Sequence, residues 1–449
     1  MKSKVRPAKM MAAGAASLAL VLAACSPGSD SSNNTDSDST SGDKTTVTFR
    51  LWDDVAAPAY EDSFKEFEKQ NEDITVKVEV VPWGQYWERL PLDINSGDMA
   101  DIFWVNSSNF AQYADNGNLI DITTALGDDH DEWVQSVVDL YTRDGKLWGV
   151  PQIWDSIALY YNMDLVQDAG IDVTSLKWVP GAGDGDTLLA AAQKLTKDEA
   201  GKTADDPAFD AAKTDVYGFN AQADMQAIYL PWLAENGAQL QDQDDQFDFA
   251  SDKGIESFSY LIDLINKYKV APSAADTNTN GDITRDLFLQ GKLALFQSGP
   301  YNLKTIAESA GDINWGIAPM VEGPEGRAGT VHGVVAVGNE KSKNRDATVR
   351  VLEWLGSAEG QLPLAEQGVS FPAAVDAQEA FVSYWADQTV DVTPFIEAAE
   401  GKTARPPVGP LVNAGTNAFV PGLADAFLGT GDTAAALKAA QDAGNAAMK

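Results

Sequence analysis

The chain has 449 residues, and its 67 acidic against 32 basic side chains give a formal net charge of −35. A protein this acidic repels phosphate backbones and anionic headgroups, which excludes nucleic acid as a partner and disfavours anionic lipid and anionic substrates. Cys25 is the only cysteine, so the chain can form no internal disulfide and no thiolate metal cluster. The length is too great for one compact core, and with 44% hydrophobic residues it predicts a globular protein of two domains.

The first residues have the pattern of an export signal. Four basic residues precede an uncharged apolar run over 10–24, which is shorter than the roughly 20 apolar residues of a membrane-spanning helix. The run ends in Leu22-Ala23-Ala24-Cys25, which resembles the bacterial lipobox. The resemblance implies a signal peptide over 1–24 and a lipid on Cys25, and a plain signal peptide with an incidental cysteine is the alternative. We therefore expect an exported protein, anchored by lipid to the extracellular face of the cell membrane.

The segment that follows, residues 25–44, has no large apolar side chain. Such a segment cannot offset the entropy lost on ordering, so we expect a disordered tether.

Strands and helices alternate after the tether. Apolar residues at every second position predict strands over 47–51 and 74–80, and a helix between them carries Tyr60, Phe64 and Phe67 on one face. Further elements are expected as strands at 101–105, 157–162 and 331–337 and as helices from about residue 85 and at 254–269, 346–355 and 433–448. This alternation predicts an α/β fold with mainly parallel sheets and helices on both faces.

Ligands of such sheets bind just beyond the carboxyl ends of the strands. Tryptophan or hydrogen-bonding side chains follow three consecutive predicted strands, as Trp52-Asp53-Asp54, Pro82-Trp83 and Asn106-Ser107. We expect these side chains to lie close together.

Several motifs, in order along the chain, resemble those of the family 1 solute-binding proteins of ABC sugar importers, the relatives of maltose-binding protein. They are Ser-Gly-Asp-Met-Ala-Asp-Ile at 96–102, Gly-Lys-Leu-Trp-Gly-Val-Pro at 145–151, Leu-Tyr-Tyr-Asn at 159–162, Ala-Gly-Ile at 169–171 and Tyr-Gly-Phe at 217–219. Further along are Phe-Leu-Gln-Gly-Lys-Leu-Ala-Leu at 288–295, Ser-Gly-Pro at 298–300 and Trp-Gly-Ile-Ala-Pro at 315–319. The resemblance covers essentially all of 45–449. Ala100 stands where the family usually has proline, which affects only local loop geometry.

The resemblance implies a two-lobed fold like that of the periplasmic binding proteins, with a ligand cleft at the hinge. Lobe one would comprise 45–152 plus 319–356, and lobe two 153–318 plus 357–449. It also implies a monomeric, non-enzymatic protein without a cofactor. Such a protein captures a carbohydrate, most simply an oligosaccharide, by hinge closure and delivers it to the permease subunits of an ABC transporter.

The candidate ligand-binding residues are aromatic, acidic or small polar side chains near predicted strand ends. They are Trp52, Asp53, Asp54, Trp83, Asn106, Ser107, Trp154, Asp155, Trp232, Gly299, Tyr301 and His332. Flat rings cover the apolar face of a sugar, and carboxylates or amides bond its hydroxyls. The resemblance places Asp155 and Tyr301 where relatives contact sugar.

Each candidate has a structural alternative. A single tryptophan is at least as often a core residue, and mid-strand Trp104 is expected there. Asp54 is equally compatible with a helix cap, and His332 with a surface histidine.

One motif resembles a calcium loop. Asp276-x-Asn278-x-Asn280-Gly281 matches the start of an EF-hand loop, but Leu287 occupies the position of the bidentate glutamate. A helix cap at Asp282 explains the same residues, and we expect no metal.

Two other functions remain open. A secreted glycoside-active enzyme needs two carboxyl groups on either side of the scissile bond, and the many acids could supply them. A binder of polyols, peptides or phosphodiesters could share the fold, but an anionic ligand would need basic side chains that the strand ends lack.

Overall fold

The computed structural model describes residues 44–409 and 411–449. The expected signal peptide, the lipid site Cys25 and the expected tether up to residue 43 lie outside the described residues. Among the helices that are described, none combines the length and the apolar character needed to cross a membrane.

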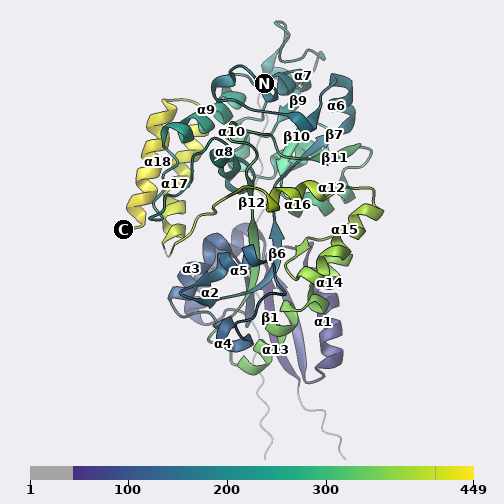
Figure 1. The fold of residues 1–449 in the computed structure, drawn as a ribbon, viewed down its shortest axis with the longest axis vertical. Helices are drawn as coiled ribbons and strands as arrows, with labels where there is room; N and C mark the ends of the chain where they lie inside the picture. Colours follow the sequence, from purple (N-terminus) through teal and green to yellow (C-terminus); the bar gives the residue numbers. More distant parts are fainter. Residues whose placement is uncertain (1–43, 410) are drawn as a thin grey trace, which may run out of the picture. The chain divides into compact units, whose positions relative to one another are not determined.

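Six strands form one sheet, in the order β14-β6-β13-β3-β1-β2. Their bounds are β1 Thr45–Leu51, β2 Ile74–Val80, β3 Ile102–Asn106, β6 Val150–Asp155, β13 His332–Gly338 and β14 Phe371–Pro372. Helices α1 (Ala57–Gln70), α13 (Arg345–Gly356) and α14 (Ala358–Glu366) gather around this sheet in Figure 1. We call this assembly lobe one.

Five strands form a second sheet, in the order β11-β7-β10-β9-β8. Their bounds are β7 Ala158–Asn162, β8 Lys197–Asp198, β9 Thr214–Phe219, β10 Leu293–Ser298 and β11 Trp315–Ala318. Lobe two consists of this sheet and its helices, which include α7 (Leu188–Leu195), α9 (Asp252–Asn266), α17 (Val412–Phe427) and α18 (Thr433–Ala447). Figure 1 shows α17 and α18 side by side. The two-lobed α/β architecture is confirmed.

Burial explains why the first predicted elements form. Phe49 of β1 is fully buried, and its ring lies 4.9 Å from Tyr60 and 5.5 Å from Phe64 of α1. The apolar face of the helix therefore covers the apolar face of the strand, as the two sequence periods predicted.

The strand directions differ from the expected mainly parallel sheets. Strand β1 runs parallel to β2 and β3, and β9 to β10, whereas all other pairs within the two sheets are antiparallel. Strand β6 carries the chain out of lobe one and β13 brings it back. Because these two strands lie side by side, they must run in opposite directions.

The boundary between the lobes was also predicted wrongly, because residues just after 356 stay with lobe one. Strand β14 pairs with β6, and Ser63 Oγ of α1 donates 2.6 Å to the carbonyl of Gly360 in α14. Helix α15 (Gln378–Asp387) packs on α14, with the ring of Phe381 4.2 Å from that of Phe371. The last crossing between the lobes therefore lies between α15 and α17.

Helix α16 (Thr393–Glu400) packs against both lobes at this crossing. The ring of Phe395 lies 5.8 Å from Tyr160 of lobe two and 6.5 Å from Phe371 of lobe one. Ser156, which follows β6, donates 2.6 Å from Oγ to the carbonyl of Phe395. These contacts place the hinge at the ends of β6 and β13.

The calcium-like motif is part of a helix. Asp276 and Asn278 lie within α10 (Ala274–Thr279), and Ser273 caps it by accepting from the Asp276 N–H and donating 2.7 Å to its carboxylate. Ser273 is therefore a helix N-cap whose hydroxyl also bonds the Asp276 carboxylate, which accounts for the acidic residue at that position. Asp282 precedes α11 (Ile283–Leu289), but its side chain makes no capping bond. In the described part of the chain, no cluster of acidic, histidine or cysteine side chains could hold a metal ion.

Candidate functional site

The ends of β1 and β2 bring three tryptophans together. Both strands end in register, with Leu51 opposite Val80, so the residues after them meet at one sheet edge. The Trp52 ring lies 5.3 Å from that of Trp83 and 5.2 Å from that of Trp87 in α2 (Trp83–Ser96). Trp83 is 53% exposed and Trp52 half-buried, so this aromatic cluster offers ring surface to a ligand. Trp104, by contrast, is fully buried, as expected for a mid-strand residue.

Asp53 connects the aromatic cluster to α1. Its Oδ1 accepts from the N–H groups of Val55 at 2.8 Å and Ala56 at 3.3 Å. The turn before the helix is therefore capped by Asp53 and not by Asp54, which is exposed. Burial raises the pKa of the Asp53 carboxyl, against the lowering effect of its two backbone bonds and of Lys304.

Asp155 is a buried acid at the end of β6. It is 7% exposed, and its Oδ1 has no hydrogen-bond partner among the described residues. Burial and, second, the charge of Asp53 raise the pKa of its carboxyl to about 7. Asp53 of lobe one and Asp155 at the hinge therefore share one electrostatic environment.

His332 is buried beside Asp155 and is not a surface histidine. The two residues are opposite each other in the pairing of β13 with β6. His332 is 7% exposed, and within the described chain its Nε2 has no partner. Burial lowers the pKa of its imidazole to about 4, so the ring is neutral at pH 7. A buried polar atom without a partner costs about 1–3 kcal/mol, and a polar ligand would remove that cost.

Tyr301 lies in the short helix Pro300–Asn302 of lobe two and is 41% exposed. Gly299 allows its position, because a Cβ there would lie 2.2 Å from the Tyr301 ring. The carbonyl of Gly299 accepts 2.8 Å from the Tyr160 hydroxyl. Burial of the hydroxyl and the charges of Asp224 and Asp155 raise the pKa of Tyr301, while part of the ring remains exposed. The charge of Asp155 at the hinge thus reaches Tyr301 of lobe two.

Asp224 is a candidate site residue that sequence reasoning missed, because its charge acts on Tyr301. It caps the helical turn Met225–Tyr229 by accepting 2.7 Å from the Ala227 N–H, and burial raises the pKa of its carboxyl. It also lines a cavity of about 250 Å³ together with Gln222, Tyr229 and Asn278. Asp224 follows β9 by five residues, so the strand-end rule could have found it.

Asn106 and Ser107 lie at the junction of β3 and α3 (Ser107–Asp115). Asn106 Oδ1 accepts 2.8 Å from the amide of Asn109. Ser107 is 2% exposed, and its Oγ lacks a partner in the described structure.

Two predicted tryptophans are more deeply buried than expected. Trp154 is 5% exposed, and its ring stacks on Phe371 at 4.5 Å. Trp232 is fully buried in lobe two, stacked on Trp178 at 4.7 Å. Trp232 was predicted wrongly, since it is a core residue that no ligand can stack on.

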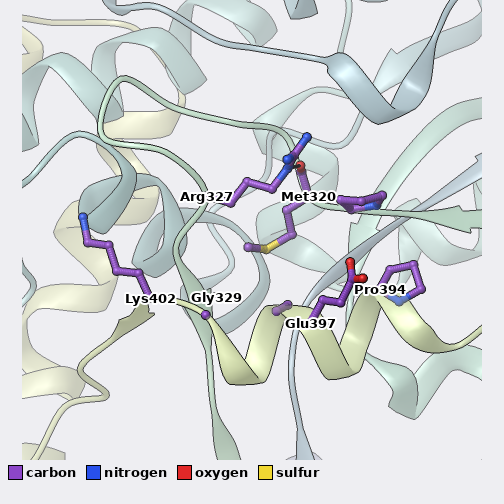
Figure 2. Close-up of a pocket in the computed structure, with 9 residues that line it drawn as sticks. Met320, Arg327, Gly329, Pro394, Glu397 and Lys402 are labelled. Carbon is purple, nitrogen blue, oxygen red and sulfur yellow. Dashed lines mark hydrogen bonds between the residues drawn. The ribbon is translucent and has the colours of Figure 1, made fainter.

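A separate pocket of about 110 Å³ contains none of the predicted residues. Figure 2 shows Arg327 and Glu397 projecting from different walls of it. Arg327 donates 2.7 Å to the carbonyl of Met320 and 2.6 Å to that of Thr174, and Lys402 donates 3.0 Å to Ala234. Because these cations already bond the backbone, the pocket has less to offer a sugar than the aromatic cluster and the acids around Asp155.

A family model described as bacterial extracellular solute-binding protein matches residues 53–362. The maltooligosaccharide ABC transporter solute-binding lipoprotein of Streptococcus pneumoniae is 25% identical over 370 residues, covering 81% of this chain and 80% of that protein.

Solved structures of two bacterial proteins illustrate the likeness of this fold to known ones. The crystal structure of UspC from M. tuberculosis has 43% sequence identity and a TM-score of 0.73, covering 90% of this chain and all of that one. The ABC substrate-binding protein Lmo0181 from Listeria monocytogenes, in complex with cycloalternan, has a TM-score of 0.77 at 23% identity, covering 90% and 99%. The second likeness bears on the fold alone.

Proposed function

Because the chain belongs to the family of bacterial extracellular solute-binding proteins, we propose that it captures a neutral oligosaccharide between its two lobes and presents it to the permease of an ABC transporter. The pneumococcal relative is named for maltooligosaccharide, which supports a sugar as the solute. In this proposal Cys25 carries the lipid that holds the exported monomer at the membrane.

One observation carries the choice of a sugar. Exposed ring surface at Trp52 and Trp83 belongs to the same strand-end edge as Asp53, whose charge reaches the buried carboxyl of Asp155. A sugar has an apolar face for the rings and hydroxyl groups that donate to carboxylates. The carboxyl groups of Asp53 and Asp155 disfavour an anionic ligand. Lys304 lowers the pKa of Asp53, but burial outweighs it, so this cation does not make the site attractive to anions.

Capture would proceed by closure about the ends of β6 and β13. The side chains proposed to bind the sugar come from both lobes, with Trp52 and Asp53 in lobe one and Tyr301 in lobe two. A sugar that touches both sets binds the closed arrangement better and so shifts the population toward it.

A thermal-shift screen of the full-length chain against neutral mono- to tetrasaccharides tests this proposal. A ligand that binds only the folded state raises the melting temperature, by an amount that grows with its concentration. At least one oligosaccharide should do so, and glucuronic acid should not. A flat response to every saccharide would contradict the proposal.

One observation favours a second candidate, a glycoside-cleaving enzyme. Such an enzyme pairs a carboxyl of raised pKa with a second carboxylate, and the pKa of Asp155 is raised in part by the charge of Asp53. However, Asp53 Oδ1 already bonds two backbone N–H groups. A reducing-sugar assay on the oligosaccharide that raises the melting temperature separates the candidates, because a binding protein leaves the number of reducing ends unchanged.

A further inference from the structure

The two lobes touch at a second place, where α3 of lobe one meets α17 of lobe two. Asn413 of α17 donates from Nδ2 to Asn109 Oδ1 of α3 at 2.6 Å. Asn109 in turn donates from Nδ2 to Asn106 Oδ1 at 2.8 Å. This asparagine relay, Asn413–Asn109–Asn106, therefore ends on a predicted ligand-binding residue.

The relay determines the orientation of its middle amide. Asn109 uses its oxygen toward lobe two and its nitrogen toward Asn106, so each bond favours the amide orientation that the other needs. All three side chains are half-buried. Such groups can be rehydrated when the helices separate, so the contact is reversible at low cost.

The surroundings of the relay are polar and uncharged. Thr416 lies one turn after Asn413 in α17, and its Oγ1 is buried without a partner in the described residues. Ser107, in the first turn of α3, also has a buried and unpartnered hydroxyl. No ion pair of the described residues joins α3 to α17, so the Asn413–Asn109 hydrogen bond provides the polar attraction between these helices.

We propose that Asn109 and Asn413 are positioning residues that couple lobe closure to the orientation of Asn106. When α3 and α17 meet, the relay fixes the orientation of the Asn106 amide. When the lobes separate, Asn109 loses the hydrogen bond from Asn413, and the amide that donates to Asn106 is no longer fixed. The relay consists of protein side chains alone, so it stabilises the arrangement in which α3 and α17 meet independently of the ligand. Only its effect on affinity depends on the proposed sugar-binding function.

Hydrogen–deuterium exchange of the full-length chain, without added sugar, tests the relay itself. The variants are Asn109→Ala, Asn413→Ala and the double variant, and Asn417→Ala is the matched control because Asn417 is an exposed residue of the same helix. Peptides covering both α3 and the start of α17 should exchange roughly 2- to 10-fold faster in either single variant. The double variant should exchange no faster than Asn109→Ala, since that substitution alone already breaks both bonds of the relay.

Additive effects of the two substitutions, or effects no larger than that of Asn417→Ala, would overturn the proposal. So would faster exchange confined to the substituted helix, because a relay must loosen both helices.

Titration with maltotriose as the probe gives an independent measurement. If it binds, Asn413→Ala should weaken binding roughly 2- to 10-fold, mainly through faster dissociation, and Asn109→Ala should weaken it at least as much, because Asn109 makes both bonds of the relay. The double variant should again be no worse, and Asn417→Ala should match the wild type. Additive losses in the double variant, or a smaller loss in Asn109→Ala than in Asn413→Ala, would contradict the coupling. If maltotriose does not bind, hydrogen–deuterium exchange without sugar still tests whether the relay exists. Failure of the relay and failure of the proposed function are therefore distinguishable.

Discussion

Asp155 and His332 are opposite each other across β6 and β13, the two strands that carry the chain between the lobes. Both are buried, and each has a polar atom, Asp155 Oδ1 and His332 Nε2, without a partner in the described structure. The strands of the hinge therefore also hold groups that can recognise a ligand. A hydroxyl that bonds these atoms would link recognition directly to the strands about which the lobes move.

Trp83→Ala should weaken sugar binding at least about 10-fold, because it removes the most exposed ring of the aromatic cluster. The free energy of unfolding should fall by less than about 1 kcal/mol, since 53% of the side chain is exposed. Titration calorimetry and chemical denaturation measure the two effects. Leu92→Ala, at another exposed position of α2, is the control and should leave affinity unchanged.

Asp155→Asn should stabilise the protein at high pH only. The pKa of Asp155 is raised to about 7 in the folded protein, so the folded state prefers the protonated carboxyl. The destabilisation is absent below the unfolded value of about 4, grows up to about pH 7 and is complete above it. The isosteric amide should therefore add roughly 1–4 kcal/mol to the free energy of unfolding at pH 8 and nothing at pH 4.

Denaturation curves from pH 4 to pH 8 provide that measurement. Asp168→Asn, at an exposed position of α6 (Met163–Ala169), serves as the control. A gain of equal size at both pH values would mean that burial does not raise the pKa of Asp155 as described.

Gly299→Ala should disturb the position of Tyr301. The added Cβ would lie 2.2 Å from the Tyr301 ring, so the ring must move. We expect sugar affinity to fall at least about 5-fold. Gly431→Ala, where a Cβ meets nothing within 4 Å, is the matched control. Unchanged affinity in Gly299→Ala would remove Tyr301 from the site.

Trp232→Phe should separate packing from recognition. Trp232 is fully buried on Trp178, so the smaller ring should cost about 1–3 kcal/mol of unfolding free energy. Affinity for sugar should stay within about 2-fold of the wild type. A large loss of affinity in a folded variant would return Trp232 to the site.

The aromatic edge of lobe one could be predicted from the sequence because it follows from local rules. Strand period placed Trp52 after β1 and Trp83 after β2, and parallel pairing brought the two rings together. Trp87 lies one turn beyond Trp83 in α2, and helical spacing could have added it.

The remaining site depends on relationships between distant parts of the chain. Asn413 meets Asn109 across 304 residues, and no local pattern marks that pair. Trp232 was wrongly predicted to bind ligand, because a position near the start of a helix does not show whether the side chain faces a ligand or packs into a core. Residues 357–387 were assigned to the wrong lobe because the pairing of Phe371 with Trp154 is likewise nonlocal.

Titration calorimetry of the full-length chain with neutral mono- to tetrasaccharides tests the central claim most directly. The account predicts saturable binding of at least one oligosaccharide, with one site per chain. The same sugar should be recovered intact from the calorimeter cell afterwards. Absence of binding heat with every saccharide, or recovery of shortened sugar, would contradict it.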